Sequence, residues 1–331
     1  MGKVTVLVPI YNVEEYVEGC LESLLNQTLA DIKILAIDDG SPDNSKEIVK
    51  KIAAKDSRVE LIEKENGGYG SVLELGIKKT NSEFLLICDP DDWLAPKALE
   101  VLYDEAIRKN LDLVVGDKFN VYENGSNQEY IKTFKPELKI VPNQVYEGKN
   151  LGKFNFGLVS PHAKLFKKDI VKNISFPYHV SYTDLVLYII GLTKAKRVEY
   201  INQPLAYYRI ERPGNTKTDV RASIIEDYLI GWNSILNQLS YEDRKNPLLL
   251  YRLYYQLRYV LVEYRRVKNQ PEADKYFDKV VESFDKLLPY KTLIFEASKE
   301  NSFRKKIVNH LLFNRSTRKA MAKLIVSEKN S

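Results

Sequence analysis

The sequence predicts an α/β fold in which a mostly parallel sheet is flanked by helices and followed by a C-terminal helical subdomain. Up to about residue 115, short apolar runs rich in β-formers alternate with amphipathic helical segments, which is typical of βαβ units and a parallel sheet. Beyond about residue 220, apolar residues recur at spacings of three and four, as on the buried face of a helix. These two patterns divide the chain into an α/β part and a helical part.

Five apolar runs are the expected strands of the sheet. Their nearly continuous apolar character predicts burial on both faces, as in a sheet that helices cover. The runs are residues 4–10, 32–37, 59–62, 83–88 and 111–115, and amphipathic helices are expected at 14–25, 45–55 and 96–109. A three-layer α/β core follows from this alternation.

The middle of the chain is less regular. Residues 118–145 are polar and predict a hairpin or a loop excursion rather than a new domain. Between residues 151 and 210, a helix is expected after Tyr182-Thr183-Asp184 and a strand at 197–201. The chain is therefore expected to divide into a domain at 1–218, with halves 1–117 and 118–218, and a helical domain at 219–331.

Composition restricts the class of protein. The formal net charge of +5 over 331 residues is small, so no nucleic-acid partner is implied. Cys20 and Cys88 lie in apolar runs, which predicts buried thiols in a reducing compartment rather than a disulfide framework. No apolar run is long enough to span a membrane. We therefore expect a cytoplasmic protein, docked at most on the inner face of the cell membrane.

Polar residues follow three of the expected strands, where an open parallel sheet binds its ligands. Five carboxylates from two strand ends are expected at this edge, and their repulsion favours a hard cation, Mg²⁺ or Mn²⁺. Such an ion can stabilise a diphosphate leaving group. A solvated turn with a helix cap is the alternative for the Asp38 segment. The three segments are Pro9-Ile10-Tyr11-Asn12, Asp38-Asp39-Gly40-Ser41-Pro42-Asp43 and Asp89-Pro90-Asp91-Asp92.

These three segments, together with Asn66-Gly67-Gly68, resemble in order and spacing the motifs of family 2 of the glycosyltransferases, which have the GT-A fold. The resemblance covers residues 1–115 strongly and 150–215 more loosely. It implies an inverting transferase that takes a sugar from a nucleotide diphosphate, usually a UDP-sugar. The implied acceptor is a hydroxyl of a glycan, a glycoprotein or a lipid-linked saccharide, and the implied catalytic domain is residues 1–218.

The resemblance also assigns roles around the nucleotide. Asp39 would accept from the base, and Asp89 would hold the ribose. In the Asp-x-Asp motif, Asp91 would be the principal metal ligand, assisted by Asp92. The remaining residues expected to bind the nucleotide sugar are Pro9, Tyr11 and Asn12 at the first strand end, Pro90 within the motif, and Asn66 and Gly67, for which a plain turn is the alternative.

The chain departs from the family at Ser71-Val72-Leu73-Glu74, where many relatives carry an arginine at the start of a helix. The missing arginine leaves a base or diphosphate contact to another residue. The segment after the last core strand resembles the family's closing segment, so Arg209 or Arg212 is expected to contact the diphosphate; a surface arginine is the alternative for each.

A transferase of this type needs a general base, because the acceptor hydroxyl does not ionise near pH 7. By resemblance the base is Asp184, and the alternative is a carboxylate that stabilises a helix N-terminus. Three residues are candidates for the acceptor side: Trp93, Tyr182 and His162. Trp93 would be a sugar platform or a packing residue, and His162 would line the acceptor pocket, assist at the metal or be structural.

Two other functions stay open at this stage. A sugar nucleotidyltransferase has a related arrangement but normally a glycine-rich first loop, which Pro9-Ile10-Tyr11-Asn12 lacks. A catalytically silent glycan-binding or partner subunit would not require Asp91 and Asp184. The basic, apolar C-terminal helices around residues 303–315 are expected either to contact an anionic membrane surface or to pack on the core.

Overall fold

The computed structural model describes residues 2–122, 127–210, 221–298 and 303–327. The chain forms two compact units, Met1–Asn215 and Thr216–Ser331. The expected domain boundary at 218/219 falls in residues 211–220, outside the described residues. The division of the first domain into a nucleotide half and an acceptor half stays a prediction.

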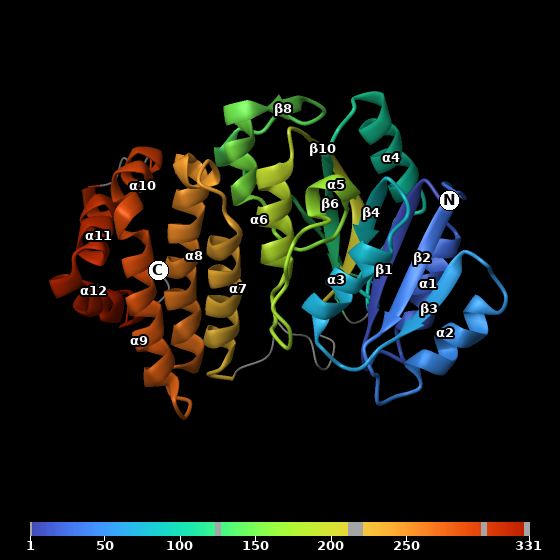
Figure 1. Cartoon of the computed structure of the whole chain (residues 1–331), viewed down its shortest axis with the longest axis horizontal. Helices are drawn as coiled ribbons and strands as arrows, with labels where there is room; N and C mark the ends of the chain where they lie inside the picture. The colour runs from blue at the N-terminus through green and yellow to red at the C-terminus, as the bar shows by residue number, and fades with distance from the viewer. Residues whose placement is uncertain (1, 123–126, 211–220, 299–302, 328–331) are drawn as a thin grey trace. The chain divides into compact units, whose positions relative to one another are not determined.

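The first unit is built on one mixed sheet (Figure 1). Along its main path the strand order is β3-β2-β1-β4-β9-β6-β10-β5, with β7 paired to β6 and β8 paired to β10. The strands are β1 (Val4–Ile10), β2 (Ile32–Asp38), β3 (Val59–Glu63), β4 (Phe84–Ile87), β5 (Trp93–Leu94), β6 (Leu113–Val121), β7 (Gln128–Ile131), β8 (Val145–Glu147), β9 (Lys164–Lys167) and β10 (Arg197–Arg209).

The N-terminal half of the sheet is parallel, as expected. β1 lies between β2 and β4 in parallel register, and β3 extends the row beyond β2. Every residue of β1 is buried, whereas in β3 at the edge only Val59 is buried and the other residues are partly or fully exposed. The prediction of burial on both faces therefore holds for the central strands and not for the edge strand, which has a neighbour on one side only.

The second half of the sheet differs from the sequence prediction. β9 inserts between β4 and β6 and runs antiparallel to both. β6 begins at Leu113 and continues to Val121, so it is longer than the predicted strand at 111–115. It extends because it pairs with β7 in a hairpin, which confirms the predicted excursion after residue 118. β10 is also longer than predicted and changes register between Tyr200 and Ala206.

Helices cover both faces of the sheet. Alternate β1 residues, Val4, Val6 and Val8, join a core cluster with residues of α1, α2 and α4. Leu7 faces the other side, where a Cβ on Gly76 of α3 would lie 2.9 Å from its side chain, so this helix approaches closely. The helices of this unit are α1 (Val17–Leu25), α2 (Ser45–Ala53), α3 (Tyr69–Lys79), α4 (Ala98–Arg108), α5 (Lys168–Val171) and α6 (Asp184–Lys194), with 3₁₀ helices at Pro136–Leu138 and Gly148–Phe156.

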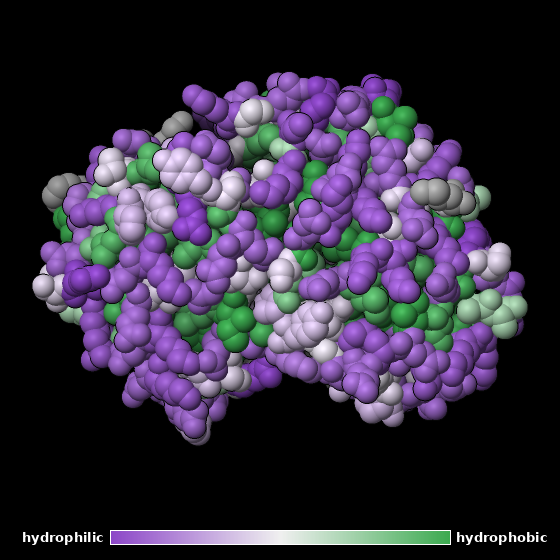
Figure 2. All heavy atoms as spheres, viewed as in Figure 1, coloured by the Kyte–Doolittle hydropathy of each residue, from purple (hydrophilic) through white to green (hydrophobic). Residues whose placement is uncertain are grey.

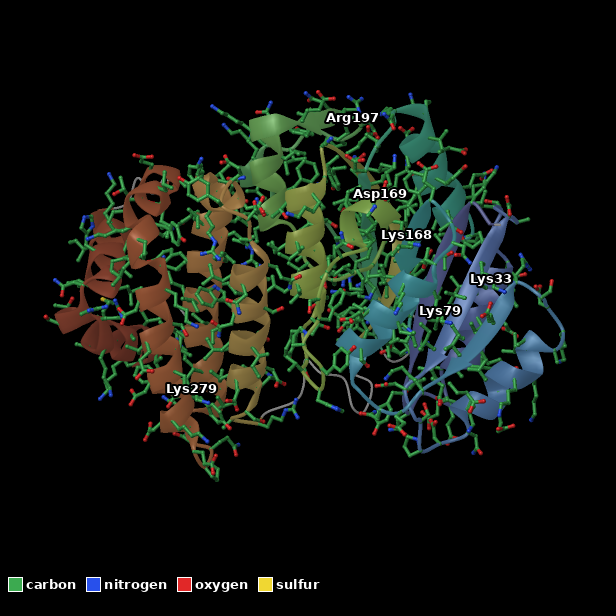
Figure 3. All side chains as sticks on the ribbon, viewed as in Figure 1. Lys33, Lys79, Lys168, Asp169, Arg197 and Lys279 are labelled. Carbon is green, nitrogen blue, oxygen red and sulfur yellow. The ribbon has the colours of Figure 1, made fainter. Side chains whose placement is uncertain are left out.

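Among its described residues the second unit is almost all helix, as predicted. Its core contains Trp232, whose indole N–H donates to the Leu253 carbonyl at 2.9 Å. Lys279 of α9, labelled in Figure 3, pairs with Glu226 of α7. The helices are α7 (Ile224–Gln238), α8 (Pro247–Val267), α9 (Ala273–Ser283), α10 (Lys291–Ala297), α11 (Phe303–Phe313) and α12 (Arg315–Ser327), with 3₁₀ helices at Asp243–Lys245 and Phe284–Tyr290.

Polar residues cover most of the visible surface (Figure 2). Across residues 2–122, 127–210, 221–298 and 303–327, no helix combines the length and the apolar character that a membrane crossing requires.

Candidate active site

The predicted acid motif forms the connection between two strands. β4 ends at Ile87 and β5 begins at Trp93, so Asp89-Pro90-Asp91-Asp92 lies at the carboxyl edge of the parallel strands. The Asp92 amide donates to the Asp89 carbonyl at 3.0 Å, which closes the turn. β5 then pairs with β10. The local fold therefore places three carboxylates within four residues at the end of a buried strand.

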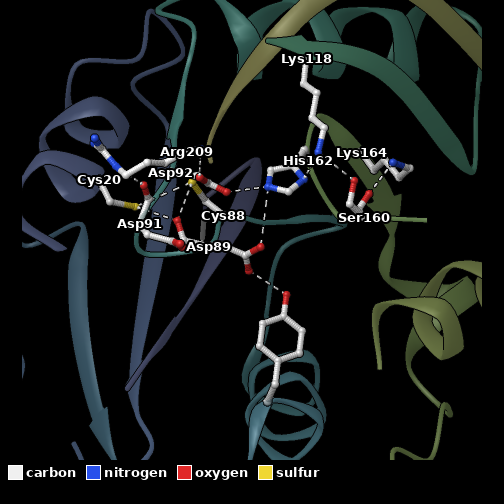
Figure 4. Close-up of polar contacts among 11 residues, drawn as sticks. Cys20, Cys88, Asp89, Asp91, Asp92, Lys118, Ser160, His162, Lys164 and Arg209 are labelled. Atoms are coloured by element: carbon white, nitrogen blue, oxygen red, sulfur yellow. Dashed lines mark hydrogen bonds and ion pairs between the residues drawn. The ribbon is translucent and has the colours of Figure 1, made fainter. Parts of the chain in front are cut away.

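Asp92 is held from two sides (Figure 4). One carboxylate oxygen, Oδ2, lies 2.6 Å from His162 Nε2, and Oδ1 accepts from the Arg209 amide at 2.8 Å. Only 2% of Asp92 is exposed. Burial, followed by the charges of Asp91 and Asp89, raises the pKa of Asp92 well above its ordinary value.

Both carboxylate oxygens of Asp89 also lie near polar groups of other residues. Its Oδ1 accepts from the Tyr69 hydroxyl at 2.8 Å, and its Oδ2 lies 3.7 Å from His162 Nε2. Burial, with the charge of Asp91 as the second cause, raises its pKa to about 7. The charge of Asp91 therefore disfavours the ionised form of both Asp89 and Asp92, which is the condition that a bound cation relieves.

The donor set fits a divalent cation. Asp89, Asp92 and His162 each offer one ligand atom, and these atoms lie within 4.8 Å of one another. Carboxylate oxygens suit Mg²⁺ and Mn²⁺, and an imidazole nitrogen is acceptable to Mn²⁺. This set contains His162, for which assistance at the metal was one of three predictions. Asp91, the predicted principal ligand, is not in the set, but its charge acts on both other acids.

A buried lysine lies behind His162. Lys118 Nζ is 3.3 Å from His162 Nδ1 and 4.0 Å from the centre of the Tyr208 ring. Because an ammonium group can only donate, this contact favours the tautomer in which Nε2 carries the proton that faces Asp92. The tautomer in which Nε2 binds a metal requires Lys118 to move or to lose its proton. Sequence analysis missed Lys118, because it assigned residue 118 to a loop.

The predicted base, Asp184, is the first residue of α6 and therefore lies at a helix N-terminus. Burial raises the pKa of Asp184, while hydrogen bonding by the Leu185 amide and the charges of Lys164 and Lys118 act in the opposite direction. The charge of Asp184 in turn contributes to the raised pKa of Asp89. Two carboxylates that are 95 residues apart in the sequence therefore lie close enough to interact.

Lys164 is a further buried cation that sequence analysis missed. It is 1% exposed, and its ammonium group donates to the Ser160 carbonyl. Burial, followed by repulsion from Lys118, lowers its pKa to about 7, against the charges of Asp184 and Asp117. Tyr182, a candidate on the acceptor side, precedes Asp184 in a left-handed conformation with φ of 63°.

The carboxylate of Asp39 is held separately from the motif. Its two oxygens accept from the amides of Gly67 and Gly68 at 2.9 and 2.8 Å, and Lys64 pairs with Oδ1. The five expected carboxylates thus form two groups, since Asp38 is likewise bonded to a nearby amide, that of Ser41, at 3.3 Å. The amides that were predicted to face the ligand donate to Asp39 in this structure.

The other residues predicted to bind the nucleotide lie near Asp39. The side-chain amide of Asn66 donates to the Asp39 carbonyl at 3.0 Å. Pro9 is buried in β1, Tyr11 is 51% exposed, and Asn12 has a φ of 54°. These positions are compatible with an open platform for a base at Tyr11, and the assignment itself stays a prediction.

Lys64 contacts the segment where the resemblance expects an arginine. Its Nζ donates to Ser71 Oγ at 2.9 Å as well as pairing with Asp39. Sequence analysis offered no signal for it, because Lys64 follows an edge strand in a run of charged residues.

Trp93 and Arg209 are packed into a row of stacked side chains. The Trp93 ring stacks on Tyr207 with centroids 5.2 Å apart, and the Arg209 guanidinium lies 5.1 Å from the ring centres of both Trp93 and Tyr16. Arg209 Nε also donates to the Asp91 carbonyl at 3.2 Å. These contacts favour the packing alternative for Trp93. Arg212, the other candidate, lies outside the described residues.

The two cysteines are buried and free, as predicted. Their sulfur atoms lie 3.7 Å apart, and Cys20 Sγ is 3.6 Å from the Asp89 carbonyl. Both thiols therefore pack against the start of the acid motif.

Comparison with known proteins agrees with the geometry of the site. The family model described as "Glycosyl transferase family 2" matches residues 5–175. Glycosyltransferase GlyG of Streptococcus pneumoniae is 30% identical over 68% of this chain and 76% of that protein. Glycosyltransferase GlyA of the same organism is 29% identical over 63% of this chain, but this match spans only 31% of GlyA.

A solved structure shows the same fold. The crystal structure of S. aureus TarS residues 1–349 in complex with UDP-GlcNAc superposes with a TM-score of 0.71 and covers 98% of this chain and 90% of that chain. At 17% identity this similarity bears on the fold alone. It confirms the predicted GT-A architecture with C-terminal helices.

Proposed function

Because the chain belongs to glycosyl transferase family 2, we propose that it transfers a sugar from a UDP-sugar to an acceptor hydroxyl, with inversion and with a divalent cation. The observation that carries this proposal is the cluster of Asp89, Asp92 and His162 at the end of β4, with Asp184 close enough to act on it electrostatically. The TarS complex with UDP-GlcNAc supports a UDP-linked donor.

The cation is proposed as Mn²⁺ or Mg²⁺, held by Asp89 and Asp92 with Asp91 close by. When bound there, such an ion neutralises the charge of the leaving diphosphate. Asp89 and Asp92 support the assignment because each has a raised pKa, so the protein alone does not satisfy their negative charge. His162 orients Asp92 through the 2.6 Å contact, and it becomes a ligand only in the tautomer that Lys118 disfavours.

Asp184 is proposed as the general base. Its raised pKa makes it a stronger base than an ordinary aspartate, and its charge acts on Asp89, which supports a position near the motif. It takes the proton of the acceptor hydroxyl as that oxygen forms a bond to the anomeric carbon. The bond from this carbon to the diphosphate breaks in the same displacement, so UDP leaves and the configuration inverts.

The donor nucleotide is proposed to bind beside Asp39, with Tyr11 under the base and Asn12, Asn66 and Gly67 around it. A base N–H that bonds to Asp39 has to compete with the Gly67 and Gly68 amides or to share the carboxylate with them. Lys64 is the proposed cation here, in place of the arginine that many relatives carry.

The acceptor is proposed as a glycan, a glycoprotein or a lipid-linked saccharide, reached at the cytoplasmic side of the membrane. Lys305 and Lys306 of α11 are exposed and available to an anionic surface. Two cations of α12, Arg315 and Lys319, instead pair with Asp285 and Asp278. Membrane contact through these helices therefore stays a prediction.

The experiment is release of UDP from a panel of UDP-sugars, with and without Mn²⁺, in the presence and absence of saccharide acceptors. We expect release to require Mn²⁺ and to be accelerated by an acceptor. A sugar nucleotidyltransferase would instead form the nucleotide sugar from a sugar phosphate and UTP. A silent subunit would release no UDP under any condition, which would refute the proposal.

A further inference from the structure

Tyr69 lies at the centre of the site, although no part of the family motif points to it. It is the first residue of α3, and its hydroxyl donates to Asp89 Oδ1 at 2.8 Å. Burial and the charges of Asp89, Asp184 and Asp91 all raise the pKa of Tyr69. The phenol is therefore protonated. It donates to Asp89 of the acid motif and lies within range of the charge of Asp184, the proposed base.

The backbone that carries Tyr69 is fixed on both sides. Asp39 accepts from the Gly67 and Gly68 amides, and the His179 amide donates to the Gly67 carbonyl at 2.8 Å. Gly68 has a φ of 79°, and a Cβ there would lie 2.9 Å from the His179 nitrogen. The left-handed conformation and the close approach both require glycine. Tyr69 thus follows a segment that is tied to the proposed nucleotide site and to the loop before Asp184.

The hydrogen bond from Tyr69 gives the two carboxylate oxygens of Asp89 different surroundings. Oδ1 faces the phenol, whereas Oδ2 lies 3.7 Å from His162 Nε2. Asp89 belongs to the set whose ligand atoms converge within 4.8 Å. A carboxylate anchored through one oxygen has less rotational freedom for the other, which reduces the entropy lost when that oxygen binds an ion.

We infer that Tyr69 is a positioning residue for metal binding, which holds the Asp89 carboxylate through Oδ1 so that Oδ2 faces the cation site. This inference rests on the proposed function, because it presumes that Asp89 binds the cation. The competing explanation is that the same bond only anchors the start of α3. A purely structural role would lower stability without changing affinity for the ion.

The test compares two substitutions that each remove one hydroxyl. Tyr69→Phe removes the donor to Asp89. Tyr178→Phe is the matched control, because Tyr178 is 52% exposed and its hydroxyl donates to Glu74 at 3.4 Å rather than to an acid of the motif. Free Mn²⁺ is measured by electron paramagnetic resonance during titration of the full chain with UDP present. Thermal unfolding of each variant is measured in parallel, without divalent ions.

We expect Tyr69→Phe to raise the Kd for Mn²⁺ by about 10-fold, as for the loss of a residue that orients a metal ligand. Its thermal midpoint should stay close to that of Tyr178→Phe, and Tyr178→Phe should bind Mn²⁺ like the wild type. In an Asp89→Asn background, Tyr69→Phe should cause no further loss, because the oriented group is gone.

An equal Kd for Tyr69→Phe and the wild type would refute the inference. So would a loss of affinity that persists undiminished in the Asp89→Asn background, because Tyr69 would then act through another group. If the wild type itself binds no Mn²⁺ with UDP present, the proposed function fails, and this outcome is distinct from a failure of the Tyr69 inference alone.

Discussion

The aspartates at the ends of β2 and β4 carry the same charge but are compensated in different ways. Asp39 after β2 has a lysine and two backbone amides on its carboxylate. The acids after β4 face one another, and two of them have a raised pKa. The comparison shows that acidic residues at a strand end do not by themselves indicate a metal site. The informative feature is negative charge that the surrounding protein leaves uncompensated.

The largest expected effect comes from Asp184, whose charge adds to that of the acids after β4 and helps to raise the pKa of Asp89. Asp184→Asn should lower kcat by about 10³-fold, within the range for loss of a general base. Binding of UDP-sugar, measured by calorimetry, should change less than about twofold, because the base acts on the acceptor. Asp169→Asn is the control, since this aspartate, labelled in Figure 3, is also in the first turn of a helix but forms an exposed pair with Lys172. Unchanged turnover in Asp184→Asn would contradict the assignment.

The second prediction compares the acids after β4 with Asp39 by measuring how much Mn²⁺ stabilises a variant of each. With Mn²⁺ at 100 times its Kd, binding should stabilise the wild type by about 2.7 kcal/mol. Asp92→Ala should lose this increment in a thermal-shift assay, because Asp92 is one of the two proposed carboxylate ligands. Asp39→Asn should keep it, even if it weakens donor binding, because Asp39 is compensated by Lys64 and the loop amides. Equal loss in both variants would mean that the two groups share one cation after all.

The third prediction concerns pH in the presence of a chelator. The folded pKa of Asp89 is about 7, above its ordinary value of about 3.9, so the folded state binds the proton more tightly between these values. Stability is therefore lost as pH rises from about 4 to 7, by at most about 1.4 kcal/mol for each pH unit. Asp89→Asn should flatten this dependence in thermal melts. If the stability of both proteins depended on pH in the same way, the pKa of Asp89 would not be raised in the folded state.

The smallest effect is expected at Arg209, which joins β10 to the acid motif. Arg209→Lys keeps the charge and the amide that bonds to Asp92, but it loses the Nε donor to the Asp91 carbonyl and the planar stacking. We expect a loss of about 1 kcal/mol in unfolding free energy. Denaturant titration would measure it. A larger fall in Mn²⁺ affinity than in stability would extend the role of Arg209 to the metal site.

The sequence predicted those parts of the molecule that depend on local pattern. The central strands and the acids that follow them were located because apolar runs and motif spacing are contiguous in the chain. Asp184 was located by resemblance, and the structure places it in range of Asp89. α3 was not among the helices found by periodicity, since Gly70 and Gly76 interrupt its pattern and reflect close packing that no local rule reveals.

The rest of the site depends on topology. Lys118 and His162 meet because β6 continues past its predicted end and because β9 inserts between β4 and β6. Lys64 and Tyr69 reach different acids from the two ends of one short segment. Such pairings across distant strands and loops leave no periodic signal in a single sequence.

The stacked row beside the motif also gives the protein a natural optical probe. The chain has two tryptophans, Trp93 in the first unit and Trp232 in the second. Trp93 lies against a guanidinium next to the acids, whereas Trp232 is fully buried. Fluorescence of Trp93 should therefore change when nucleotide and metal arrive, while emission from Trp232 follows unfolding of the helices. Replacing either indole by phenylalanine would assign the two signals.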